Sequence, residues 1–355
     1  MQQAGLAVTV LAGGPPEAAG GRAGFETIQL PPARAADAGF KTIIDAAGRP
    51  IDEAFKARRR DLVLAAFARI RPDIVLIESF PFGRRAFRFE LLPLIAAARQ
   101  ATPRPAILAS VRDVLVARND PARAAEIVDT VRRDFDLVLV HGDPALIGLG
   151  ASFPAADRIA DRLRYTGYVA GSPGADDGVA GVGEVIVSAG GGAVGLALLR
   201  AALAARPVSP LAGARWRLIA GPHLPAADYA ALAAVLPEGA ILERFRDDFP
   251  ALLGRCALSI SQAGYNTTLD IIRARPRAIV VPFAASGETE QAVRSALLAQ
   301  RGILHVVPEA ALDGARLAAA IVAALAAPLP AAPLAVRLDG AAASAALIAG
   351  LPVLG

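Results

Sequence analysis

Residues 261–302 read SQAGYNTTLDIIRARPRAIVVPFAASGETEQAVRSALLAQRG and hold the strongest structural signal in the chain. Small polar residues at 261–268 predict a turn that leads into a helix, residues 278–281 predict a buried strand, and a loop with two acids and an amide follows. A helix N-terminus leaves backbone N–H groups free and carries partial positive charge, so it favours a diphosphate. Asp270 can accept hydrogen bonds from ribose hydroxyls, and Gln291 can both donate to and accept from sugar hydroxyls. This order of features is the one that a nucleotide-sugar pocket needs.

Around this stretch, strand-like runs alternate with helical patterns, which predicts parallel sheets with helices on both faces. We expect strands at 6–11, 73–77, 106–110, 137–140, 184–187, 216–220, 241–243, 258–260, 279–281 and 304–307. We expect helices at 51–70, 87–101, 121–135, 196–205 and 333–351, and one more that starts after Gly142-Asp143-Pro144. Residues 171–183 are rich in Gly, Asp, Ser and Pro and predict a linker between two domains, 1–168 and 169–334.

The composition narrows the class of protein. The chain has 355 residues, 54% of them hydrophobic, which is enough for two α/β cores. The net charge is +4 and no run of Lys and Arg is interleaved with aromatic residues, so nucleic acid is not an expected partner. The Arg58-Arg59-Arg60 cluster is interpreted as a solvated helix face, with contact to anionic lipid or phosphate as the alternative.

Cysteine, histidine and hydropathy argue against a metal centre and a membrane span. The single cysteine, Cys256, lies in an apolar run, so we expect it to be buried and unreactive. The three histidines lack metal-ligand spacing, and no metal is predicted. No apolar run reaches transmembrane length and no signal peptide is present, so we expect a cytoplasmic protein. Peripheral contact with the inner membrane through Arg84, Arg85 and Arg88 beside their neighbouring phenylalanines stays open.

A glycine-rich loop, SAGGGAVG at 188–195, follows a predicted strand and precedes a predicted helix. Glycines allow the backbone to approach a phosphate or a sugar closely. The loop is not a Walker A motif, because no Gly-Lys-Ser/Thr follows, and no acid ends the next strand as in a dinucleotide fingerprint. A tight turn without a ligand is the alternative interpretation.

The 261–291 segment resembles the donor half of family 28 glycosyltransferases, which include the bacterial enzymes that make the lipid-linked peptidoglycan precursor. Four further phrases resemble a group of bacterial glycosyltransferases: ESFPFGRRAFRFELLPL (78–94), VRDVL (111–115), LVHGDP (139–144) and YTGYV (165–169). The resemblance covers nearly the whole chain. It implies an α/β fold of the GT-B type, with two Rossmann-like, doubly wound parallel-sheet domains facing across a cleft. It also implies that the C-terminal helix, 335–355, crosses back onto the N-terminal domain.

The resemblance further implies inverting, metal-independent transfer of a hexosyl group from a nucleotide-diphosphate sugar, expected to be a UDP-sugar, with no cofactor. The acceptor, whether lipid, polysaccharide or small molecule, stays open. Phe245 resembles the position that packs near the uracil, with core packing as the alternative, and Asp270 stands where the family usually has Glu. The implied donor-binding residues are Ser188, Gly190, Gly191, Gly192, Phe245, Ser261, Gln262, Ala263, Gly264, Asn266, Thr267, Asp270, Glu288, Glu290 and Gln291.

Glu78, Asp113 and His141 are the catalytic candidates, because each follows or ends a predicted strand, where ligand-binding residues of α/β sheets lie. A histidine or a desolvated carboxylate suits a general base. Ion pairs, Arg112 with Asp113 or Arg85 with Glu78, are the alternative. Relatives begin with a strand, a Gly-x-Gly-His loop and a helix, whereas this chain opens with MQQAGLAVTV, which resembles the end of that helix and the second strand. We therefore expect the native protein to carry a further N-terminal βα unit.

Two other functions fit the same architecture. A nucleotide-sugar epimerase would need several carboxylates and a histidine in the cleft. A non-catalytic nucleotide-sugar-binding protein would need only the donor pocket.

Overall fold

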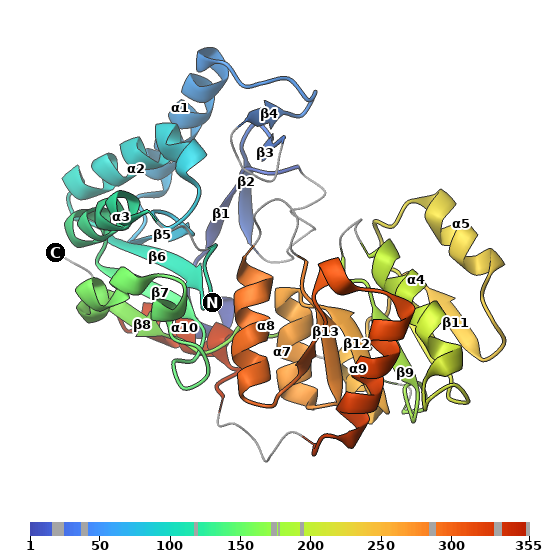
Figure 1. The fold of residues 1–355 in the computed structure, drawn as a ribbon. Helices are drawn as coiled ribbons and strands as arrows, with labels where there is room; N and C mark the ends of the chain where they lie inside the picture. The colour runs from blue at the N-terminus through green and yellow to red at the C-terminus, as the bar shows by residue number, and fades with distance from the viewer. Residues whose placement is uncertain are drawn as a thin grey trace. The chain divides into compact units, whose positions relative to one another are not determined.

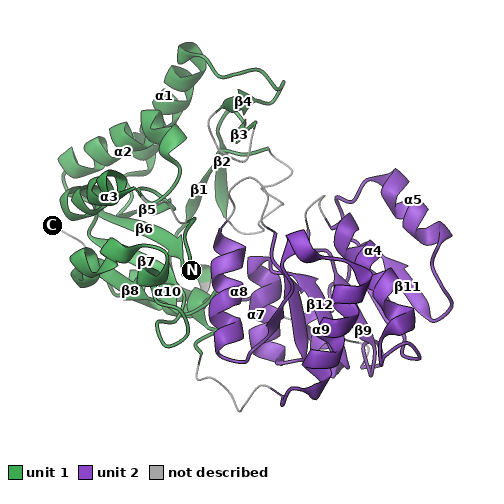
Figure 2. Cartoon of the chain, viewed as in Figure 1, with its two compact units in different colours: residues 1–169, 336–355 green, residues 170–335 purple. Residues whose placement is uncertain are grey.

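The computed structural model describes residues 1–15, 25–36, 42–116, 120–171, 176, 178–191, 195–283, 289–329 and 336–352. The chain forms two compact units (Figures 1 and 2). Unit 1 comprises Met1–Val169 and Val336–Gly355, and unit 2 comprises Ala170–Ala335. The divisions lie one residue from the expected 168/169 and 334/335 boundaries.

Unit 1 is built on a four-stranded parallel sheet, with strand order β5-β6-β7-β8. A separate parallel pair, β1-β2, and an antiparallel pair, β3-β4, complete its strands. The strands are β1 Thr9–Ala12, β2 Glu26–Gln29, β3 Ala33–Ala35, β4 Ile43–Asp45, β5 Ile74–Glu78, β6 Ala106–Arg112, β7 Leu137–His141 and β8 Leu163–Tyr165. The helices are α1 Glu53–Ile70, α2 Arg88–Gln100, α3 Pro121–Asp134 and α10 Gly340–Ala349, with 3-10 turns at Gln2–Ala4, Arg85–Phe87, Leu149–Ala151 and Pro154–Arg162.

Alternate residues of the central strands face two apolar layers, as the two-residue repeat of a strand requires. Ile107 and Val138 point into the large core of unit 1. Leu108 and Leu139 point the other way and pack with Ile348 of α10 and with Leu6. The last helix thus covers one face of the unit 1 sheet.

Arg59 corrects the interpretation of the Arg58-Arg59-Arg60 cluster as a solvated face. Its side chain is 2% exposed and forms a bidentate ion pair with Glu90 of α2, at 2.7 and 2.8 Å. It also donates to the carbonyl groups of Gly13 and Pro31, which follow β1 and β2. A guanidinium can be buried when its donors are satisfied in this way. Arg59 therefore ties α1 to α2 and to the β1-β2 pair.

The chain after β7 also differs from the expectation. Gly142-Asp143-Pro144 was predicted to start a helix, but a turn and two 3-10 segments follow. The Asp143 carboxylate accepts from the Ala145 N–H at 3.0 Å and from the Arg337 N–H at 3.0 Å. An Asx turn of this kind competes with helix formation. Asp143 therefore anchors the segment that leads into α10.

Unit 2 contains a six-stranded parallel sheet with the order β11-β10-β9-β12-β13-β14. Counted along the chain this is 3-2-1-4-5-6, the doubly wound arrangement. The strands are β9 Val185–Ser188, β10 Trp216–Ile219, β11 Ala240–Glu243, β12 Leu258–Gln262, β13 Ala278–Val281 and β14 His305–Val306. All residues of β9, β10 and β13 are buried, as expected when helices cover both faces.

The helices of unit 2 are α4 Leu196–Ala205, α5 Ala226–Ala234, α6 Phe249–Arg255, α7 Tyr265–Ala274, α8 Glu290–Gln300 and α9 Gly314–Ala326, with 3-10 turns at Arg206–Val208 and Glu309–Ala311. Helices α4 and α9 share a core that includes Leu199 and Leu317. A Cβ on Gly314 would lie 2.7 Å from that of Ala204, so glycine allows this close approach. The predicted helix at 196–205 is confirmed, and the predicted strands of this half are confirmed within two residues.

Candidate functional site

The strand order of unit 2 reverses between β9 and β12. Ser188 at the end of β9 pairs in register with Ser261 of β12. In an open α/β sheet, ligands bind outside the carboxyl ends of the strands at such a switch point. Both serines are buried, and within the described residues the Ser261 Oγ has no hydrogen-bond partner. The two segments singled out in the sequence therefore meet where a ligand site is expected.

The glycine-rich loop begins directly after Ser188. Gly190 has φ 71°, in the left-handed region where glycine is favoured. Its N–H donates to the Ser188 Oγ at 3.4 Å, and a Cβ at this position would lie 3.5 Å from the Gln262 Oε1. The loop therefore contacts the end of β12. Gly192 lies outside the described residues.

Helix α7 begins beside this loop, with Gly264 as its N-cap. Among the residues that the structure describes, no side chain caps α7, and its first turn carries no acid. Its positive end is thus not neutralised from within the helix, which suits an anion. Ser261 and Gln262 form the end of β12, Ala263 follows, and Asn266 and Thr267 lie in the first turn of α7.

Asp270 is half-buried in the second turn of α7, one turn later than an ordinary first-turn acid. Burial raises the pKa of its carboxyl to about 6, and the nearby Arg273 opposes this rise. The carboxyl forms no hydrogen bond or ion pair with any part of the chain that the structure describes. A desolvated, unpartnered carboxyl of this kind marks a functional-site candidate.

Phe245 follows β11 and is 63% exposed. Core packing, the alternative interpretation of this residue, is therefore wrong. An exposed aromatic ring at the carboxyl end of a strand offers a flat apolar surface to a planar ligand.

Glu290 and Gln291 open helix α8, and both make local contacts that the sequence did not reveal. Glu290 pairs with the buried Arg294 at 2.9 Å. The Gln291 Oε1 accepts from the Phe283 N–H at 3.0 Å, which holds the end of β13 to α8. Within the described residues this leaves the amide nitrogen as a donor. Glu288 lies outside the described residues.

In unit 1, His141 ends β7 and is the centre of a small polar cluster. Its Nε2 lies 2.8 Å from the Ser110 Oγ, and its Nδ1 lies 3.0 Å from the Thr166 Oγ1. Burial lowers the pKa of the imidazole, and the negative charge of Glu78 opposes this. The ring is therefore neutral near pH 7, the state that a general base needs. Sequence reasoning missed Ser110 and Thr166, although Ser110 stands at the expected end of a strand.

The two carboxylates proposed alongside His141 differ from each other. Glu78 is exposed and pairs with Arg84 at 2.6 Å. The Arg85–Glu78 pair considered from the sequence is wrong, because Arg85 pairs with Glu126 instead. The chain turns sharply at Ser79 and Arg84, both with positive φ, and this brings Arg84 to Glu78.

Asp113 is fully buried at 0% exposure. Its carboxylate accepts from the Tyr168 hydroxyl at 3.0 Å and from the Val114 N–H at 2.8 Å. Backbone at Gly142 covers it so closely that a Cβ there would lie 2.6 Å from the Asp113 Cβ. These contacts indicate a structural role for Asp113. Of the three catalytic candidates, His141 is the one that the geometry favours.

Among the residues described, no group of three or more His, Cys, Asp or Glu is placed to hold a metal ion. No described helix is long and apolar enough to cross a membrane.

Phe80 and Phe82 belong to the core of unit 1. Of the phenylalanines beside Arg84, Arg85 and Arg88, only Phe87 and Phe89 therefore lie outside that core. Burial raises the pKa of the Cys256 thiol to about 12, which agrees with the expected unreactive cysteine.

Known proteins resemble this chain both in a family domain and in overall fold. Residues 190–345 match the family model of the glycosyltransferase family 28 C-terminal domain. The calicheamicin glycosyltransferase CalG4 aligns with a TM-score of 0.61 and 16% identity over 98% of this chain and 89% of that one. MurG from Acinetobacter baumannii aligns with a TM-score of 0.58 and 15% identity over 99% and 92%. The spinosyn rhamnosyltransferase SpnG, complexed with thymidine diphosphate, aligns with a TM-score of 0.52 and 21% identity over 83% and 72%.

The two Rossmann-like units and these alignments place the chain in the GT-B fold class, as the sequence predicted. Within that class, residues 190–345, which include most of unit 2, are similar to the C-terminal domain of glycosyltransferase family 28.

Proposed function

We propose that the chain transfers a hexosyl group from a nucleotide-diphosphate sugar, with a UDP-sugar as the first candidate, to an acceptor hydroxyl. The transfer inverts the anomeric carbon and needs no metal ion. The observation that carries this proposal is the meeting of the glycine loop and the start of α7 at one switch point, with Asp270 in the second turn of that helix and without a partner among the described residues.

The geometry of unit 2 supports the donor roles proposed for its residues. The loop after Ser188 and the N-terminus of α7 hold the diphosphate and stabilise the negative charge that grows on it as it leaves. Asp270 accepts from ribose hydroxyls, and the exposed ring of Phe245 stacks on the base. Glu290 and the Gln291 amide nitrogen bind hydroxyls of the transferred sugar.

The acceptor chemistry is assigned to unit 1. A neutral His141 takes the proton from the acceptor hydroxyl, which then attacks the anomeric carbon as the nucleotide diphosphate departs. Thr166 holds Nδ1 and fixes the plane of the imidazole. The acceptor proton reaches Nε2 through Ser110, whose hydroxyl passes its own proton to the ring as it takes the proton of the acceptor. The acceptor is a lipid, a polysaccharide or a small molecule.

Calorimetric titration with UDP, dTDP and GDP tests the donor half of the proposal. The thymidine diphosphate complex of SpnG is the reason to include dTDP. We expect UDP to bind, Asp270→Ala to weaken it, and Glu238→Ala, an exposed acid elsewhere in unit 2, to leave it unchanged. A folded protein that binds none of the three nucleotides would contradict the proposal.

The epimerase alternative is not favoured by the polar groups near His141 that the structure describes. Of the two carboxylates predicted for this region, Asp113 is buried and bonded, and Glu78 is exposed and paired with Arg84. Release of free monosaccharide from the donor alone would nevertheless reveal that activity, and binding without turnover would indicate a nucleotide-sugar-binding protein.

A further inference from the structure

The loop that carries Phe245 is anchored on both sides of the exposed ring. Arg244 donates to the Leu224 carbonyl at 3.0 Å, and its guanidinium lies 4.3 Å from the centre of the Tyr229 ring. Arg246 forms a bidentate pair with Asp248, at 2.8 and 2.5 Å. The backbone around Phe245 is therefore held while its side chain stays in solvent.

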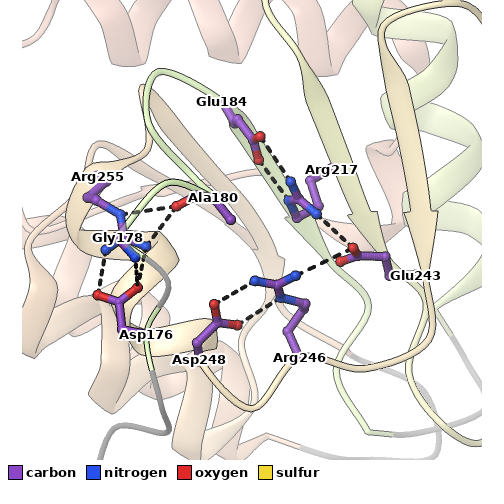
Figure 3. A network of polar contacts seen from close by, with 9 residues as sticks. All are labelled: Asp176, Gly178, Ala180, Glu184, Arg217, Glu243, Arg246, Asp248 and Arg255. Carbon is purple, nitrogen blue, oxygen red and sulfur yellow. Dashed lines mark hydrogen bonds and ion pairs between the residues drawn. The ribbon is translucent and has the colours of Figure 1, made fainter.

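Arg246 also belongs to a row of alternating charges that crosses three strands (Figure 3). Its Nη1 lies 3.6 Å from the Glu243 Oε1 at the end of β11. The same oxygen accepts from Arg217 of β10 at 2.7 Å. Arg217 continues to Glu184, next to β9, with contacts of 2.7 and 3.0 Å. The loop is thus connected to the middle of the sheet.

Because most of this row is buried, its side chains are restricted to one arrangement. Three of its charged side chains are buried: Arg217, Glu184 and Asp248. Each has lost its hydration, and only the ion pair with its partner offsets that cost, so breaking the pair would be strongly unfavourable. The planar fork of a guanidinium fixes the direction of each contact. Asp248 stands at the N-cap position of α6, so Arg246 joins the end of β11 to the start of that helix.

We propose that Arg246 is a positioning residue that holds residues 244–248 so that the Phe245 ring stays exposed as a platform for the nucleobase. The inference rests on the proposed function, because the platform has a purpose only if unit 2 binds a nucleotide. An unanchored phenylalanine would gain free energy by packing its ring against nearby apolar surface. The anchor prevents that collapse.

Hydrogen–deuterium exchange on the ligand-free protein tests the anchor by itself. The variant is Arg246→Gln, which removes the charge and the fork at a side chain only 23% exposed. We expect faster exchange at the amides of 244–248 and unchanged exchange in β9 and β12. Arg316→Gln, an exposed arginine of α9, is the matched control and should change neither region. Unchanged exchange at 244–248 would overturn the proposal.

A double-mutant cycle on UDP affinity tests the link to Phe245. Stacking on a base predicts that Phe245→Ala weakens UDP by about 5-fold to 100-fold. Arg246→Gln should weaken it by about 3-fold to 10-fold, and the double variant should bind like Phe245→Ala alone. Arg246→Lys, which keeps the charge but not the fork, should fall between wild type and Arg246→Gln. Pyrophosphate, which has no base, should bind wild type and Arg246→Gln equally.

Two outcomes of the cycle would overturn the platform role. Independent, additive effects of the two substitutions would show that Arg246 does not act through Phe245. A folded wild-type protein that binds no UDP would remove the proposed function and the platform role together. This second failure is recognised separately, because exchange at 244–248 is measured without nucleotide.

Discussion

Ser188 and Ser261 pair in register across the β9–β12 boundary of unit 2, at the point where the strand order reverses. Each begins or adjoins one of the two segments that the sequence marked for phosphate binding. The chain continues from β9 toward one edge of the sheet and from β12 toward the other edge. The connections therefore diverge and leave a crevice outside the carboxyl ends of these two strands, where doubly wound folds bind ligands. The paired serines therefore mark the centre of the proposed donor site.

The conformation of Gly190 predicts a measurable cost of adding a side chain. Gly190→Ala places a Cβ on a residue with φ 71°, which costs about 1–2 kcal/mol of folding free energy. Urea unfolding measures this loss, and calorimetry should show weaker UDP binding if the loop contacts the diphosphate. Gly213→Ala is the control, because its Cβ meets nothing within 4 Å and its φ is not in the left-handed region. Equal stability of the two variants would contradict this prediction.

The raised pKa of Asp270 predicts how stability changes with pH. The folded carboxyl, with its pKa of about 6, holds its proton more tightly than the unfolded one at 3.8. The stability that the folded protein gains from binding this proton more tightly is therefore fully present at low pH, and it is lost as the pH rises from about 4 to about 6. Partial exposure reduces it to about 1–2 kcal/mol.

Urea unfolding of wild type and Asp270→Asn checks this sign. We expect the difference in unfolding free energy between Asn and wild type to grow as the pH rises across that window, because Asn cannot ionise. Parallel pH profiles for the two proteins would count against a desolvated carboxyl at this position.

The cluster around His141 predicts a loss of turnover without a loss of donor binding. His141→Gln should lower kcat by about 10²- to 10⁴-fold, the usual contribution of a general base. UDP affinity should not change, because the residues proposed to bind the donor all lie in unit 2. Since burial lowers the imidazole pKa, the acid limb of kcat/KM should have its midpoint below 6.5. Full activity of His141→Gln would remove this residue from the mechanism.

The buried Arg59–Glu90 pair predicts a large stability effect in unit 1. Arg59→Met should destabilise the protein by about 3–5 kcal/mol, because it leaves the Glu90 charge buried and unpaired. Lys56→Met breaks the more exposed Lys56–Glu53 pair on the same helix and should cost about 1 kcal/mol or less. Thermal unfolding of both variants measures the contrast, and similar losses would contradict the structural role of Arg59.

The alternation of strands and helices could be read from the sequence because hydrophobic periodicity is a local property. The helix that begins near Gly264 and the glycine loop after Ser188 were expected for the same reason. The start of a helix at Pro144 was wrong, because a contact between Asp143 and the distant Arg337 could not be foreseen from neighbouring residues.

The sequence by itself determined the two-part α/β architecture and the chemical types gathered near the proposed donor site, since both follow from residue pattern and turn chemistry. Only the tertiary structure decided which polar side chains are partnered. It buried Asp113 and Arg59, left Asp270 without a partner in the described residues, and exposed Phe245. The physical reason is that burial and pairing depend on residues far apart in the chain, and a charge changes its behaviour with the solvent and the partner it meets.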